Sequence, residues 1–263
     1  MPRVIFLHIP KTAGQSCYHF LDQCFDSDKV CPARENFQLV GKSISALEKF
    51  DVFRGHLDWS LLDCVSKDAF VFTILREPRE RIISFYFFLR RAAAQLSDEE
   101  IELPHNRGLR AAKLYSPDDF FLFGDLELRV FHDNLLDNLY THYFSGRHLL
   151  ARTTNVETLA RGDNAMKMDD IVDCALDNMR RLSGVYRISS LDLLQDDLRR
   201  IGVEPRVPTR LSDMRVNEGG GDFSLRIAEL KDLGASLETF DRIDAMAAFD
   251  SQIWGREDLF RAW

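Results

Sequence analysis

The stretch RVIFLHIPKTAGQSCYHFLDQCF, residues 3–25, joins an apolar run to an amphipathic pattern through a turn of small residues. The first part, RVIFLHI (3–9), has the length and composition of a buried strand. From residue 14 onward, apolar side chains recur at the spacing of one helix face. They are Cys17, Phe20, Leu21, Cys24 and Phe25. The turn PKTAGQS (10–16) between strand and helix is typical of a loop that binds an anion.

A second unit of the same kind follows further along the chain. AFVFTILREP (69–78) is apolar and β-branched and is stopped by charge and proline, which predicts a strand. RERIISFYFFLRRAAAQL (79–96) predicts a helix with Pro78 in its first turn. Because strands alternate with helices, we predict the α/β class, with a central parallel sheet flanked by helices. No linker or repeat divides the sequence, so residues 1–263 are predicted to form a single domain.

The rest of the sequence shows less regular patterns, from which further elements are predicted. The helices expected are 14–25, 43–50, 166–182 and 189–202, the strands 51–59 and 184–188, and the last third is expected to be mostly helical. Residues 97–117 are polar and irregular, which predicts a surface loop or lid. A long loop bearing arginines and glycines is predicted over residues 206–224.

Composition limits the kinds of partner. The 263 residues carry a formal net charge of −8, whereas non-specific binding to nucleic acid needs a basic surface, so no nucleic-acid partner is expected. No run of 18 apolar residues occurs, which predicts no membrane span. The first residues lack the apolar stretch of a signal peptide, which favours a cytoplasmic location. The five cysteines lack the spacing of zinc ligands or a disulfide framework, which predicts reduced thiols.

The turn at 10–16 has the chemistry of an anion cradle. A helix start offers unpaired backbone N–H groups and the positive end of the helix dipole. Gly14 allows close approach, and Thr12 and Ser16 add hydroxyl donors. The pattern is not the usual nucleotide loop, because there a lysine directly follows the second glycine, whereas Gln15 follows Gly14 here. Lys11 precedes Gly14 and would sit at the mouth of the turn; a plain turn with a solvated lysine is the alternative.

The second unit offers a matching cation. Its strand delivers Arg76 to the end of the sheet, and Ser84 lies about two turns into the following helix. A guanidinium at this position can donate two parallel hydrogen bonds to a phosphate. Arg79 and Arg81 are expected to be solvated helix charges.

Together, HIPKTAGQS (8–16) and LREPRERIISFY (75–86) resemble the two nucleotide-binding motifs of sulfotransferases that use 3′-phosphoadenosine 5′-phosphosulfate (PAPS). The form of the first motif is similar to the carbohydrate branch, the uronyl or heparan 2-O-sulfotransferases and their bacterial-type relatives. RGHLDW (54–59), DNLYTHYFSG (137–146) and MRVNEG (214–219) are weaker similarities. The resemblance runs from about residue 4 to residue 220.

The resemblance implies a P-loop-NTPase-like three-layer fold and specific residue roles. The residues implied to bind PAPS are Lys11, Thr12, Ala13, Gly14, Gln15 and Ser16 around the 5′-phosphosulfate, and Arg76 and Ser84 around the 3′-phosphate. Arg215 of the late loop is a further candidate, for closing over the adenosine end. Lys11 would also be catalytic, because it balances charge on the oxygen that leaves. The acceptor would be a hydroxyl, expected on a saccharide or glycoconjugate. No metal is expected, because lysine and arginine supply the positive charge.

A hydroxyl acceptor benefits from a general base. His56 follows Gly55 at a predicted strand end and matches the segment that carries the base in the resembled family, so it is the candidate. His8 is expected to be a packed, hydrogen-bonded support of the cradle, and His142 to pack in the core. Asp58 either orients the imidazole or, as we favour, is solvated.

Alternatives from other classes stay open on sequence alone. One is a nucleotide-dependent kinase or other phosphotransferase, although no convincing metal-binding aspartate ends an apolar strand. Another is a non-catalytic nucleotide- or saccharide-binding protein. The sequence names neither the acceptor nor the oligomeric state. It also leaves open whether Arg210, Arg215 and Asn217 close over the nucleotide.

Overall fold

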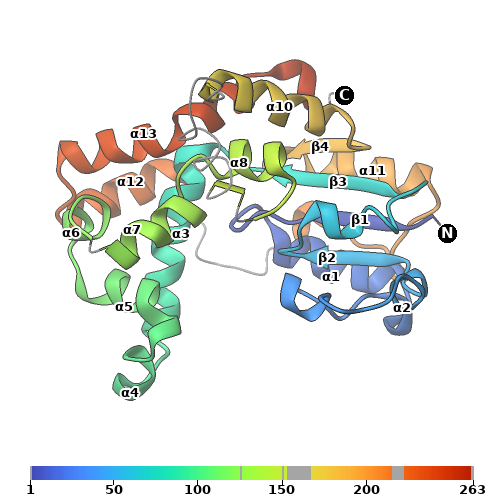
Figure 1. The fold of residues 1–263 in the computed structure, drawn as a ribbon, viewed down its shortest axis with the longest axis horizontal. Helices are drawn as coiled ribbons and strands as arrows, with labels where there is room; N and C mark the ends of the chain where they lie inside the picture. Colours follow the sequence, from blue (N-terminus) through green and yellow to red (C-terminus); the bar gives the residue numbers. More distant parts are fainter. Residues whose placement is uncertain (1, 125, 150, 153–166, 215–221, 262–263) are drawn as a thin grey trace. The chain divides into compact units, whose positions relative to one another are not determined.

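The computed structural model describes residues 2–124, 126–149, 151–152, 167–214 and 222–261 (Figure 1). Contacts along the chain gather in two compact units. Unit 1 comprises Met1–Arg76, Tyr140–Asn217 and Gly255–Trp263, and unit 2 comprises Glu77–Leu139 and Glu218–Trp254. The single domain over residues 1–263 stays a prediction.

Unit 1 is built on a sheet of four parallel strands in the order β2-β1-β3-β4 (Figure 1). The strands are β1 (Val4–Leu7), β2 (Val52–Gly55), β3 (Phe70–Leu75) and β4 (Gly184–Arg187). The helices that belong with them are α1 (Gly14–Cys24), α2 (Ile44–Glu48), α8 (Leu139–Gly146), α10 (Met168–Arg180) and α11 (Leu191–Arg200). The predicted α/β class with a central parallel sheet flanked by helices is confirmed.

The helical face predicted from residues 14–25 packs on the sheet. Cys17, Phe20 and Leu21 of α1 are fully buried in a cluster that also contains Phe6 of β1 and Phe72 of β3. The rings of Phe6 and Phe72 stack 4.9 Å apart on neighbouring strands. This cluster fixes the direction in which α1 leaves the end of β1. All five cysteines are free, in agreement with the predicted reduced thiols.

Unit 2 is helical in its described residues. It contains α3 (Pro78–Ala93), α4 (Asp98–Ile101), α5 (Arg107–Leu114), α6 (Pro117–Phe121), α7 (Leu126–Leu135), α12 (Phe223–Asp232) and α13 (Leu237–Trp254). The surface loop or lid predicted for residues 97–117 is wrong. Ser97 and Glu100 form a reciprocal capping box that starts α4, and α5 buries Ala111 and Ala112. α4 is a single turn of mostly acidic residues, which is why this part of the sequence looks like a loop.

The environment of Arg81 in unit 2 also differs from the prediction. The sequence predicts a solvated charge, but the side chain is fully buried. Its Nη1 and Nη2 donate to the carbonyl oxygens of Leu135, the last residue of α7, and Leu136, the residue after it. Arg79 is partly exposed and pairs with Asp244 at 2.7 Å, as a solvated helix charge should. Among the described residues, no helix is both long enough and apolar enough to span a bilayer.

Candidate active site

The segments that follow three neighbouring strands of unit 1 gather at one edge of the sheet. The turn 10–16 follows β1, His56 follows β2 and Arg76 follows β3. Because all these strands are parallel, their carboxyl ends share an edge, where ligands of α/β proteins bind. The order β2-β1-β3 places the turn in the middle, with His56 on one side and Arg76 on the other. Sequence reasoning thus chose residues that the fold brings together.

The turn itself has an unusual backbone. Lys11 and Ala13 have φ angles of 71° and 64°, in the left-handed region that side chains disfavour. Each such residue costs about 1–2 kcal/mol, and strain of this kind concentrates at functional loops. Ala13 occupies the N-cap position of α1, and no described side chain caps this helix. The first backbone N–H groups of α1 therefore lack the side-chain acceptor that usually satisfies one of them.

Thr12 closes the turn from inside. Its side chain is fully buried, and its hydroxyl donates to the carbonyl oxygen of Ile9 at 2.8 Å. A contribution of Thr12 to anion binding would therefore come through its backbone. Gln15 is exposed, and Lys11 and Ser16 are half-buried at the surface of the turn.

Gly14 is required where α1 begins. A Cβ placed on it would lie only 2.0 Å from Nε2 and 2.1 Å from Cε1 of His8. The imidazole therefore occupies the space that any side chain at position 14 would need. His8 is 7% exposed and its Nδ1 bonds the Tyr18 hydroxyl at 2.6 Å. The prediction that His8 is a packed, hydrogen-bonded support of the cradle is confirmed.

His56 lies directly on this support. Its ring stacks on the His8 ring, with centroids 4.4 Å apart and planes inclined by 26°. Its Nδ1 donates to the carbonyl oxygen of His8 at 3.0 Å, since a carbonyl can only accept. Its backbone N–H donates to the carbonyl oxygen of Arg34 at 2.8 Å. In the neutral imidazole the lone pair is therefore on Nε2.

The electrostatic environment keeps both imidazoles neutral. Burial is the main reason that the pKa of His8 lies well below its usual value, and the neighbouring His56, Lys11 and Arg34 lower it further. Burial also lowers the pKa of His56, against the opposing effects of the His8 carbonyl and the Glu35 charge. A neutral His56 is the form that can accept a proton.

On the other side of the turn, Tyr140 of α8 holds the backbone of Arg76. The Tyr140 hydroxyl accepts from the Arg76 N–H at 3.2 Å and donates to the Arg76 carbonyl oxygen at 2.9 Å. Tyr140 is fully buried. No local pattern predicts this contact, because the two residues are 64 positions apart.

Of the remaining predicted nucleotide residues, the structure describes Ser84 and Arg210. Ser84 is buried in α3, which belongs to unit 2. Arg210 is exposed at the start of a short 3₁₀ turn, Leu211–Asp213. Arg215 and Asn217 lie outside the described residues.

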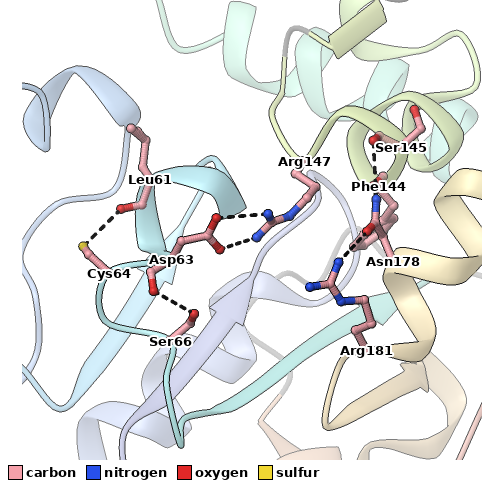
Figure 2. Close-up of polar contacts among 9 residues, drawn as sticks. All are labelled: Leu61, Asp63, Cys64, Ser66, Phe144, Ser145, Arg147, Asn178 and Arg181. Carbon is pink, nitrogen blue, oxygen red and sulfur yellow. Dashed lines mark hydrogen bonds and ion pairs between the residues drawn. The ribbon is translucent and has the colours of Figure 1, made fainter.

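The segment that leaves His56 is anchored by contacts that the sequence did not predict (Figure 2). Arg147, just beyond α8, forms a two-pronged ion pair with Asp63, and its guanidinium lies 4.4 Å from the Trp59 ring centroid. The Tyr143 hydroxyl donates to the carbonyl oxygen of Leu57 at 2.7 Å. Figure 2 also shows Asn178 of α10 bonded to the end of α8.

Asp58 belongs to the same set of anchors. Its carboxylate bonds a distant backbone group instead of the His56 imidazole or solvent, because its Oδ1 accepts from the Leu149 N–H at 2.7 Å. The solvated reading of Asp58 is therefore wrong. His142 is buried, and burial lowers its pKa to about 4, in agreement with the predicted core packing. Within the described part of the chain, no three His, Cys, Asp or Glu side chains form a metal-binding group.

The fold and this edge define an α/β protein in which the first strand leads through a tight turn into an uncapped helix start, a geometry suited to an anion. Residues 2–122 match the model of the sulfotransferase family. Over 95 residues the chain is 32% identical to a protein-tyrosine sulfotransferase of Arabidopsis thaliana, a match that covers 35% of this chain. The match covers 18% of that relative, so the chain spans less than a fifth of its length. Both findings support a sulfotransferase.

Proposed function

We propose that the chain transfers the sulfuryl group of PAPS to a hydroxyl of an acceptor, expected on a saccharide. The observation that carries the proposal is the shared position of His8. One edge of its ring fills the space beside Gly14 in the anion cradle, and one face supports His56. A proposed cradle for an anion and a neutral, oriented base thus meet at the carboxyl ends of the neighbouring strands β1 and β2.

The residues at the edge fit the co-substrate. An uncapped helix start, a glycine with no room for a side chain and a lysine at the mouth suit the 5′-phosphosulfate. Arg76, held by its backbone on the other side of the turn, suits the 3′-phosphate. Ser84 and Arg215 are proposed to assist there. When bound, PAPS supplies the sulfuryl group and a phosphate leaving group.

The proposed roles follow from charge and geometry. The backbone N–H groups of residues 12–16 hold the 5′ end. Lys11 places its ammonium beside the oxygen on which negative charge grows, so its interaction strengthens in the transition state. Nε2 of His56 accepts the proton of the acceptor hydroxyl. Since lysine and arginine provide the positive charge, we propose that no metal takes part.

The acceptor has two candidates. The first motif favours a saccharide, whereas the relative in Arabidopsis thaliana is named as acting on protein tyrosine. Both offer a hydroxyl, and His56 would serve either. A panel containing uronic-acid polysaccharides, a neutral oligosaccharide and a tyrosine peptide separates the two by the formation of 3′-phosphoadenosine 5′-phosphate.

Calorimetry tests the co-substrate first. The protein should bind 3′-phosphoadenosine 5′-phosphate more tightly than AMP or ATP, because only the first matches both the cradle and Arg76. Preference for ATP together with magnesium-dependent ATP hydrolysis would instead support a phosphotransferase. His56→Ala should abolish transfer and leave nucleotide affinity unchanged. Retained turnover in that variant would remove His56 from the mechanism.

A further inference from the structure

A buried tyrosine and a buried histidine connect helix α1 to His56. Tyr18 is 8% exposed, and its hydroxyl forms a hydrogen bond of 2.6 Å with Nδ1 of His8. The two rings meet edge to face, with centroids 5.1 Å apart and planes at 82°. The hydrogen bond and the ring contact together restrict the His8 imidazole to one orientation. In the function proposed above, His8 supports the turn and lies against His56, whereas Tyr18 has no role.

The orientation of His8 is passed on to His56. The His56 ring stacks on the His8 ring, and its Nδ1 donates to the His8 carbonyl oxygen. One residue thus fixes both the plane of the imidazole and the nitrogen that carries its proton. A hydrogen bond to the far nitrogen of a functional histidine sets its tautomer and direction.

Tyr18 is itself held by two cationic neighbours. The guanidinium carbons of Arg34 and Arg54 lie 4.4 Å and 5.0 Å from the centroid of its ring. Arg54 is buried and pairs with Asp22 on α1. Arg34 also contributes the carbonyl oxygen that accepts the His56 backbone N–H. The phenol is therefore clamped, and removing its hydroxyl should leave the ring in place.

We propose that Tyr18 and His8 are positioning residues of His56, a hydrogen-bonded pair that holds the acceptor base in one tautomer and one orientation. The inference rests on the proposed role of His56 as base. Because His8 also touches Gly14, the same imidazole serves the co-substrate cradle and the base. Loss of the Tyr18 hydroxyl should free the His8 ring and, through it, the His56 ring.

Several charged groups must be considered in any pH dependence. Glu35 faces His56 from the segment beside β2, and His8 faces it from β1. Lys11 from the turn and Arg34 act on His8. Tyr18→Phe changes none of these charges, so a shift in the pH profile would report geometry and solvent access around His56.

Tyr18→Phe is the test, because it removes one oxygen atom and keeps the ring. We expect kcat to fall roughly tenfold to a hundredfold, as for a misplaced catalytic group. The KM for PAPS and the Kd for 3′-phosphoadenosine 5′-phosphate should stay within about twofold, since the turn keeps its backbone donors. The acid limb of the kcat profile should move. Nitrogen-15 NMR of the free protein should show His56 changing from one tautomer to a mixture, because a freed His8 ring lets the stacked imidazole turn away from the His8 carbonyl that holds the proton on Nδ1.

Tyr186→Phe is the matched control. Tyr186 is a fully buried tyrosine of β4 whose hydroxyl bonds Asp197 at 2.7 Å, so the same atom is lost without contact to His56. It should leave kcat and the His56 signals unchanged. The proposal is overturned if Tyr18→Phe keeps wild-type kcat or an unaltered His56 tautomer. It is also overturned if nucleotide affinity falls as much as kcat, since Tyr18 would then serve the cradle alone.

The NMR measurement separates this inference from the function on which it rests. It needs no acceptor and no turnover. If wild-type protein transfers no sulfuryl group to any acceptor in the panel, the proposed function fails, whereas the control of the His56 tautomer by Tyr18 is still decided.

Discussion

Replacing Gly14 by alanine adds one methyl group where helix α1 meets His8. Gly14 is the first residue of α1 and does not have a left-handed backbone. In a helix, alanine is favoured over glycine by about 1 kcal/mol. If the methyl group met open space, the substitution would therefore stabilise unit 1.

The contacts in the structure instead make the substitution destabilising. The new Cβ would lie 2.0 Å, 2.1 Å and 2.6 Å from Nε2, Cε1 and Cδ2 of His8. The ring cannot move aside easily, because Tyr18 and His56 hold it. Overpacking costs about 1–3 kcal/mol, and contacts this short belong at the upper end. After subtraction of the gain in helix propensity, the free energy of unfolding should fall by about 2 kcal/mol. A loss of this size lowers Tm by roughly 4–8 °C in a chain of this size.

Urea denaturation of the single variant and of a double variant tests this explanation. In a His8→Ala background the obstructing ring is absent, so Gly14→Ala should be neutral or stabilising. The coupling between the two sites should then be about 2 kcal/mol or more. Calorimetry should also show weaker binding of 3′-phosphoadenosine 5′-phosphate by the single variant. The reasoning is refuted if Gly14→Ala raises stability, or if it costs the same with and without the His8 ring.

Three further predictions concern the other anchors and the acid stability. Tyr140→Phe removes both hydrogen bonds to the Arg76 backbone, each worth about 1 kcal/mol. In calorimetry it should weaken the binding of 3′-phosphoadenosine 5′-phosphate more than that of AMP. Equal losses would argue against the role of Arg76 at the 3′-phosphate. Asp63→Asn breaks a partly exposed ion pair with Arg147 and should cost at most about 1 kcal/mol in urea denaturation, less in high salt; a loss several times larger would contradict this estimate. Burial lowers the pKa of His132 from 6.5 to about 4, so the unfolded chain binds a proton that the folded chain does not. The free energy of unfolding should fall by about 1.4 kcal/mol per pH unit from this group as pH drops between those values, and His132→Phe should remove that contribution. An unchanged slope in pH-dependent denaturation would show that another group is responsible.

Local elements with strong patterns were predictable from the sequence. The strand at 69–78 and the helix after it correspond to β3 and α3, and the helical face of 14–25 packs as expected on the sheet. Burial of a continuous apolar run or of one helix face is encoded in neighbouring residues, so short windows contain the signal.

Contacts between distant residues were not predictable in the same way. Arg81 and Arg79 are two positions apart and equally charged, yet one is buried against the end of α7 and the other pairs at the surface. Asp58 anchors Leu149, which is 91 positions away. The partner of each side chain depends on where later segments fold, and a single sequence does not contain that information.

The sequence by itself determined that a turn of small residues with a lysine joins the first strand to a helix, that an arginine and a histidine follow the neighbouring strands, and that these strands form a parallel α/β sheet. Only the tertiary structure decided how these groups are held. It placed the His8 imidazole in the space that Gly14 leaves, put the Tyr18 hydroxyl on Nδ1 of that ring and stacked His56 on its face. The physical reason is that strand order and packing set distances between side chains, whereas residue spacing along the chain sets only which face of an element they occupy.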